Sequence, residues 1–143
     1  MSNTNGANPL RWDCTKCGCF NIKKRPKIEI FADCLPGRIA FTDVDAIVEI
    51  EGNLLLLEWK DHQAIPTGQR ILFERMTLLC PAVVFVVEGD AEHMTVKTIS
   101  VVWAGKVIPH TPANIETLRM RIKAWANWAR HHKRERRDGQ NYS

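Results

Sequence analysis

The sequence has no long hydrophobic run and no segment typical of a secretory leader. None of its apolar stretches approaches the roughly 18 residues that a membrane-spanning helix needs, which argues against a transmembrane protein. Residues 1–8 are polar and lack the basic and apolar regions of a signal peptide. No internal repeat is visible. We therefore expect a cytoplasmic protein without a membrane partner, and 143 residues suit one globular domain with a core of its own.

Cysteine is scarce and its count is odd, with four of the five residues placed before residue 35. An odd count in a reducing compartment argues against a disulfide framework. Cys14 and Cys17 form a Cys-x-x-Cys-Gly knuckle whose thiolates can bind one Zn²⁺, and Cys19 and Cys34 are available to complete the four ligands. Because there is no second Cys-x-x-Cys pair, a set of free, partly buried thiols is the alternative to a structural zinc site.

Charge is nearly balanced overall but unevenly distributed along the chain. The formal net charge is only +4, yet most acidic residues lie between Asp33 and Glu92 and basic residues gather on either side. Basic ends around an acidic centre indicate a polyanionic partner such as nucleic acid, with a cation near the middle. Two solvated basic faces are the alternative. The candidate phosphate contacts are Lys23, Lys24, Arg25, Arg130, Lys133, Arg134, Arg136 and Arg137.

The hydrophobic pattern predicts an α/β domain built around a mixed central sheet. A strand–helix–strand unit over Leu54–Val87 has the length of a parallel crossover, with Thr67 as the expected N-cap of its helix. The last helix should start near Pro112 and continue into a frayed basic extension. The expected strands are Lys27–Phe31, Ile39–Ile50, Leu54–Lys60, Val83–Val87 and Thr95–Trp103, with a hairpin over Ala104-Gly105 into Val107-Ile108.

The second and third of these strands should form a hairpin that gathers charged side chains. If Gly52-Asn53 is a two-residue loop, Asp45 lies opposite Lys60, and Ile47 lies opposite Glu58. Opposed residues and residues two apart share a face of a sheet, so Asp45, Glu58 and Lys60 should project from one side. The other side would be a core face made by Val44, Ala46, Val48, Ile50, Leu55, Leu57 and Trp59.

Two carboxylates and one ammonium on a single face suit divalent metal chemistry. Asp45 and Glu58 supply the hard oxygen ligands that Mg²⁺ prefers, and the backbone carbonyl of Trp59 lies between them. Lys60 could orient a water molecule or stabilise developing negative charge. The alternative is an ordinary ion pair between Lys60 and either carboxylate.

The segments Phe41–Glu49, Leu54–Lys60 and Thr67–Gln69 resemble the core of the PD-(D/E)XK nuclease superfamily, especially small virus-type (VRR-NUC) and Holliday-junction-resolvase-like members. The resemblance covers about a third of the chain. It implies a restriction-endonuclease-like fold, Asp45 and Glu58 as ligands of Mg²⁺ or Mn²⁺, Lys60 as the catalytic lysine, and Gln69 as an auxiliary group. The family's first helix, which often carries a glutamate, has no clear counterpart here, and Asp43 competes with Asp45 as a ligand.

We therefore expect a metal-dependent nuclease that hydrolyses phosphodiester bonds in DNA, as an endonuclease of viral or repair and recombination processing. Its location would be the host cytoplasm if the source is viral, and relatives of this kind commonly form homodimers. Residues 1–26 would form a tail with the zinc knuckle, and residues 27–143 the nuclease-like domain with its basic C-terminal helix. The alternative is a non-catalytic zinc-knuckle module that binds nucleic acid on the same scaffold.

Overall fold

The computed structural model describes residues 26–62 and 65–135, and the chain divides into two units at residues 41 and 42. In the first unit the described residues form a 3-10 helix, η1 (Ile28–Cys34), in which every residue is exposed. The strand expected at Lys27–Phe31 is therefore wrong. Alternating isoleucines indicate a strand only where a sheet buries one face, and here Ile28 and Ile30 are both exposed.

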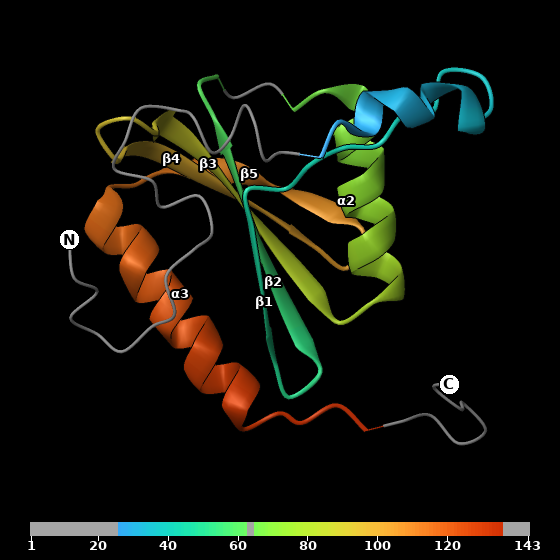
Figure 1. Ribbon diagram of the computed structural model, residues 1–143. Helices are drawn as coiled ribbons and strands as arrows, with labels where there is room; N and C mark the ends of the chain where they lie inside the picture. The colour runs from blue at the N-terminus through green and yellow to red at the C-terminus, as the bar shows by residue number, and fades with distance from the viewer. Residues whose placement is uncertain (1–25, 63–64, 136–143) are drawn as a thin grey trace. The chain divides into compact units, whose positions relative to one another are not determined.

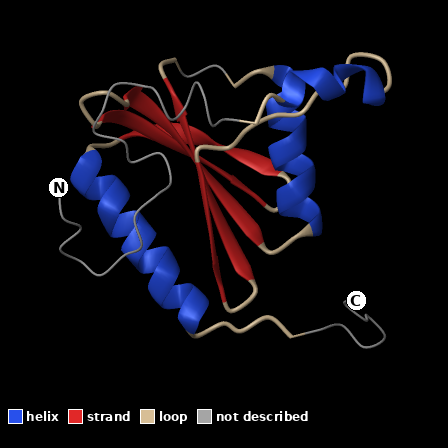
Figure 2. Ribbon diagram, viewed as in Figure 1, coloured by secondary structure: helices blue, strands red, loops and turns tan. Residues whose placement is uncertain are grey.

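The second unit is a five-stranded mixed sheet with one helix on each face, as Figure 1 shows. Its helices are separated by the sheet in the same view coloured by secondary structure (Figure 2). This arrangement confirms the expected α/β class. In chain order the elements are β1 (Ala46–Ile50), β2 (Asn53–Lys60), α2 (Thr67–Leu79), β3 (Ala82–Asp90), β4 (Thr95–Trp103), β5 (Lys106–Pro112) and α3 (Ile115–Arg130).

The strands lie in the order in which they occur in the chain. β2 and β3 are parallel and are joined by α2, whereas the other neighbouring pairs are antiparallel. A parallel pair needs a crossover of a dozen or more residues, which α2 provides. The hairpin between β4 and β5 turns at Ala104 and Gly105 as expected, and both residues have positive φ.

Each face of the sheet has its own hydrophobic core because both faces are covered by a helix. On the α2 face, Phe73 packs with Leu56, Val84 and Val102. On the α3 face, Trp125 packs with Leu55 and with other side chains of that layer. The near-continuous apolar sequence of β2 follows from this, since its alternate residues enter two different cores.

The hairpin of β1 and β2 is paired two residues away from the expected register. Ile50 pairs with Asn53, and Ala46 with Leu57, so the turn residues are Glu51 and Gly52. Both have positive φ, as a two-residue turn of this handedness requires. The expected pairing of Asp45 with Lys60 is therefore wrong, as is that of Ile47 with Glu58.

β1 is also shorter than the strand expected at Ile39–Ile50, because it begins only at Ala46. At that point the carboxylate of Asp45 accepts a hydrogen bond from the backbone N–H of Trp59 at 2.6 Å. The Asp45 side chain thus accepts a hydrogen bond from the backbone of β2, and the regular backbone pairing of β1 with β2 begins only at the following residue, Ala46.

Two further expectations at helix ends are wrong. Pro66, not Thr67, occupies the N-cap position of α2, and Thr67 is the first helical residue. The expected frayed extension after α3 is wrong for residues 131–135, the part of it that the structure describes, since the Arg134 backbone N–H donates to the Glu51 carbonyl oxygen at 2.8 Å. The start of α3 has an ordinary cap, because the Asn114 side chain accepts from the Thr117 N–H at 2.9 Å.

A buried asparagine explains why the chain after α3 docks on the hairpin turn. Asn53 is 1% exposed. Its side-chain nitrogen donates to the His132 carbonyl oxygen at 2.9 Å, and its side-chain oxygen accepts from Arg134 Nε at 2.8 Å. These bonds give a buried amide the partners that it needs and fix the chain after α3 against the start of β2.

Candidate functional site

The expected site residues lie at the carboxyl ends of the two parallel strands. Lys60 ends β2, and its Cα partner on β3 is Glu88. Paired residues of neighbouring strands point to the same face, and here this is the α2 face, which also carries Leu56 and Val84. Ligands of open α/β sheets bind outside the carboxyl ends of parallel strands, so this end is where a site is expected.

Glu58 is a buried carboxylate with only one of its two oxygens paired. The side chain belongs to a residue that is 6% exposed, and its Cα partner is the buried Val86. Its Oε1 lies 3.0 Å from the Nζ of Lys60. Its Oε2 is buried and has no hydrogen-bond partner among the described residues. A carboxylate oxygen buried in this way is costly, so its presence needs an explanation beyond packing.

The sequence placed Glu58 and Lys60 on one face correctly although the register is wrong. The two residues are two apart in β2, so they point to the same face whatever the pairing with β1. The shift does alter what lies near them. Asp45 contacts the backbone of Trp59 instead of lying opposite Lys60. Asp43 is exposed in the segment before β1.

Gln69 adds a second buried oxygen without a partner. It lies in the first turn of α2 and is 8% exposed. Its side-chain Oε1 is buried and has no hydrogen-bond partner among the described residues. This glutamine was expected only from the resemblance, in which a glutamine often opens the corresponding helix. Its burial is a property that only packing reveals.

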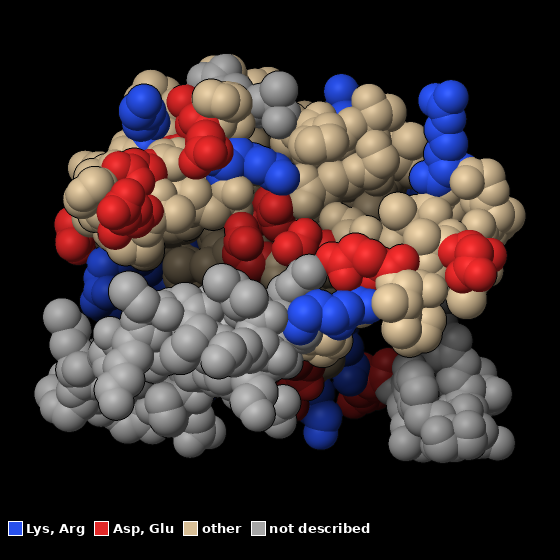
Figure 3. Space-filling view, turned by 45° about the horizontal axis from the view of Figure 1, so that its top comes forward, with Lys and Arg blue, Asp and Glu red and all other residues tan. Residues whose placement is uncertain are grey.

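A cleft of about 410 Å³ opens beside Lys60. Its floor is formed by sheet residues of β3 and β4, namely Val86, Glu88, Thr98 and Ser100. On the β2 and α2 side it is lined by Lys60, His62, Ile65 and Arg70. On the β5 side it is lined by Val107, Pro109 and His110. Of the expected catalytic residues, only Lys60 lines the cleft. Figure 3 turns this end of the molecule toward the viewer, and acidic side chains gather near the centre of the face.

Glu88 was missed by the sequence reasoning. It is partly buried, and its Oε2 accepts from the Thr98 hydroxyl at 3.4 Å. The available signal was the same one that led to Glu58, since Glu88 directly follows the apolar run Val83–Val87 just as Glu58 directly follows Leu54–Leu57. The sequence alone did not show that the end of β3, at Glu88, pairs with the end of β2, at Lys60.

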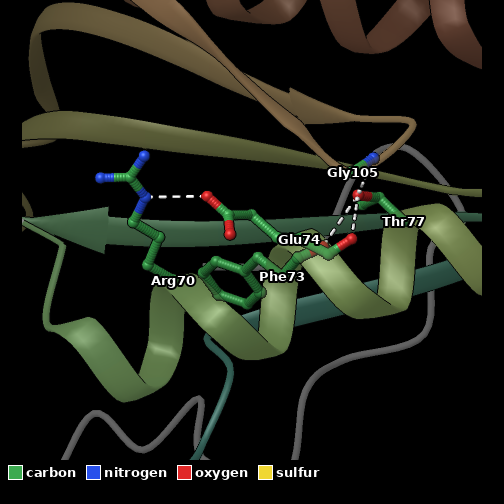
Figure 4. A network of polar contacts seen from close by, with 5 residues as sticks. All are labelled: Arg70, Phe73, Glu74, Thr77 and Gly105. Atoms are coloured by element: carbon green, nitrogen blue, oxygen red, sulfur yellow. Dashed lines mark hydrogen bonds and ion pairs between the residues drawn. The ribbon is translucent and has the colours of Figure 1, made fainter.

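α2 is held against the sheet by a polar network that also positions the side chain of Arg70 (Figure 4). Arg70 Nε lies 2.8 Å from Glu74 Oε1. One turn further on, Thr77 donates to the Phe73 carbonyl oxygen at 2.8 Å and accepts from the Gly105 N–H at 3.1 Å. Thr77 therefore ties the last turn of α2 to the turn between β4 and β5.

The residues expected to contact phosphate differ in their surroundings. Arg130 and Lys133 are exposed at the end of α3. Arg134 is committed to Asn53 and lies 5.9 Å from the ring centre of Trp128, so it supports the fold. Lys23, Lys24, Arg25, Arg136 and Arg137 lie outside the described residues, as do Cys14, Cys17 and Cys19 of the expected zinc knuckle. Cys34 is exposed in the first unit.

An acidic group that the sequence did not single out lies in the turn between β3 and β4. Asp90, Glu92 and His93 bring three possible ligand atoms within 4.8 Å of one another, the only such group among the described residues. The hydrogen bond from His93 holds the pKa of Asp90 below its ordinary value. All three side chains are exposed, so local hydrogen bonding in the turn accounts for the arrangement.

Comparisons with known proteins do not place the chain in a family. No family model matches it, and neither a curated protein nor a solved structure does so. Within the described residues no helix is both long and apolar enough to cross a membrane. The site must therefore be judged from its own chemistry.

Proposed function

We propose that the chain is a metal-dependent nuclease with a restriction-endonuclease-like core, acting on phosphodiester bonds in DNA. The observation that carries the proposal is Glu58. A buried carboxylate oxygen without a partner is costly, and a bound cation would complete its coordination. A structural ion pair with Lys60 would account for Oε1 but would leave Oε2 unexplained.

The donor set fits a hard divalent cation. Mg²⁺ and Mn²⁺ take oxygen ligands, usually one or two carboxylates with water. Glu58 Oε2 offers one such ligand, and Asp45 keeps a second carboxylate oxygen besides the one that accepts from Trp59. These two carboxylates and the Trp59 backbone carbonyl would hold the ion. When bound, it would lower the pKa of a coordinated water molecule and offset negative charge on the phosphate.

The remaining roles belong to side chains whose positions are fixed by the fold. Glu58 holds the Lys60 ammonium at 3.0 Å, and Lys60 reaches the cleft, where it can donate to a phosphate oxygen or to the attacking water. Gln69, in the first turn of α2, would position a further group without supplying charge. The exposed Arg130 and Lys133 are suited to phosphate contacts that do not read sequence.

The test is a cleavage panel of linear, nicked, forked and four-way DNA with Mg²⁺ or Mn²⁺. Glu58→Gln and Lys60→Ala should each abolish cleavage, but only Glu58→Gln should also weaken Mg²⁺ binding, because lysine is not a ligand. Glu49→Gln and Lys106→Ala are matched controls, since both residues are exposed outside the site. Wild-type cleavage rates for both site variants, in preparations free of host nucleases, would refute the proposal.

A further inference from the structure

The floor of the cleft beside Lys60 carries a strip of polar side chains on β3 and β4, where packing against α2 would favour apolar ones. On the α2 face β4 changes from Val102, fully buried in the core, to Ser100 and Thr98, which are partly exposed. β3 changes in the same way from Val84 to Glu88. The polar side chains therefore form a continuous strip across two strands, at the point where the sheet is open to a ligand.

Both irregularities of strand pairing within the described sheet lie at this cleft. β3 and β4 change register between Glu88 and Gly89, and β4 and β5 change register between Ile99 and Val101. In the second case Pro109 and His110 face Ser100 alone, and all three residues line the cleft. β-bulges re-aim side chains and are over-represented next to binding and active sites.

The first bulge depends on a residue that has no side chain. A Cβ at Gly89 would collide with the backbone of β4 at Thr95. Only glycine permits this approach of the two strands, and it comes immediately after Glu88. At both register shifts the strands lose regular backbone hydrogen bonds beside the cleft. Irregularities of this kind are common next to binding sites, so we interpret the cleft as a binding site.

The size and chemistry of the cleft fit one nucleotide but not a duplex. About 410 Å³ lies in the range of sites for small organic ligands. Val107 and Pro109 offer apolar contacts to a flat ring, and Glu88 offers an acceptor to its N–H groups. Lys60 and Arg70, on the opposite side, offer positive charge to a phosphate. The ion pair of Arg70 with Glu74 is exposed and therefore weak enough to be exchanged.

We propose that this cleft binds a single unpaired nucleotide of the substrate, with its phosphate toward Lys60 and its base on the floor at Glu88, Thr98 and Ser100. The proposal rests on the proposed nuclease function and adds the substrate class to it. The hydrogen-bonding edge of a base reaches Glu88 only when it is not engaged in a base pair. The protein therefore selects single-stranded, flapped or extruded nucleotides over intact duplex.

The test separates binding from cleavage by measuring affinity of the full chain without added Mg²⁺ or Mn²⁺ and without a chelator, so that any resident zinc is kept. Fluorescence anisotropy is recorded at one salt concentration with three labelled probes of equal length: a single strand, the same strand with abasic sites, and a duplex. The single strand should bind best. Ser100→Trp, which fills the cleft, should lower its affinity about tenfold, as expected for loss of a stacked base, and should leave the duplex and abasic probes unchanged.

A less disruptive variant provides a second test in case the tryptophan variant does not fold. Glu88→Ala removes the acceptor without adding bulk and should lower single-strand affinity about fivefold. Ala91→Trp and Glu92→Ala are matched controls in the exposed turn outside the cleft. Equal affinity for all three probes, or no effect of either cleft variant, would overturn the inference even if the protein cleaves DNA. Selective binding without cleavage under any metal would support the inference and overturn the proposed nuclease function.

Discussion

Replacing Glu58 with leucine should make the protein more stable while removing its activity. Leucine is similar in size, and the neighbours of Glu58 on the α2 face are the apolar Leu56 and Val86. If the glutamate were present for structural reasons, the same change would remove a buried ion pair and destabilise the fold. The direction in which the free energy of unfolding changes therefore distinguishes a functional carboxylate from a structural one.

The magnitude follows from three contributions. Removing a buried oxygen without a partner should relieve about 1–3 kcal/mol. The lost pair with Lys60 should cost only about 1 kcal/mol, because Lys60 lines the open cleft and its ammonium can be hydrated there once Glu58 is removed. Added apolar burial contributes about another 1 kcal/mol. The free energy of unfolding should thus rise by about 1–2 kcal/mol, allowing for imperfect packing of the new side chain.

The assay is urea denaturation with and without Mg²⁺. A ligand that binds only the folded state stabilises it by about 2.7 kcal/mol at one hundred times its Kd. Wild-type protein should gain stability as Mg²⁺ is added, and Glu58→Leu should not. Glu49→Leu, at an exposed position of β1, controls for a general effect of adding leucine. A loss of about 3 kcal/mol in Glu58→Leu, together with no effect of Mg²⁺ on wild type, would refute the reasoning.

The other predictions concern the fold and the expected zinc knuckle. Asn53→Ala should lower the free energy of unfolding by about 2–4 kcal/mol, measured by urea denaturation, because two well-formed buried hydrogen bonds are lost and their partners are left unpaired. Gly89→Ala should cost at least about 2 kcal/mol and shift the backbone amide resonances of the bulge, because a Cβ cannot be accommodated there. Intact protein should carry about one zinc per chain by elemental analysis, and Cys17→Ser should lose it; metal-free protein from a chelator-free preparation would contradict the zinc hypothesis.

Much of the fold was predictable because local signals agreed with one another. Helical spacing and Pro81 placed α2, and a sufficient alternation of side chains placed β4 at its observed bounds, Thr95–Trp103. The β1–β2 hairpin was also expected, but its register was not. A turn at Glu51 and Gly52 requires a positive φ at a glutamate, which is an uncommon conformation that sequence alone does not suggest.

The candidate site, like the fold, was predictable from the sequence only in part. The sequence by itself determined that Glu58 and Lys60 share a face, since residues two apart in one strand point to the same side whatever the pairing of that strand. Only the tertiary structure decided that Glu58 is buried with one oxygen unpaired, that Glu88 lies beside Lys60, and that Arg134 is bound to Asn53. Burial and contacts between distant strands depend on how three-dimensional layers pack, and a periodic pattern along one strand carries no information about which other strand will lie beside it.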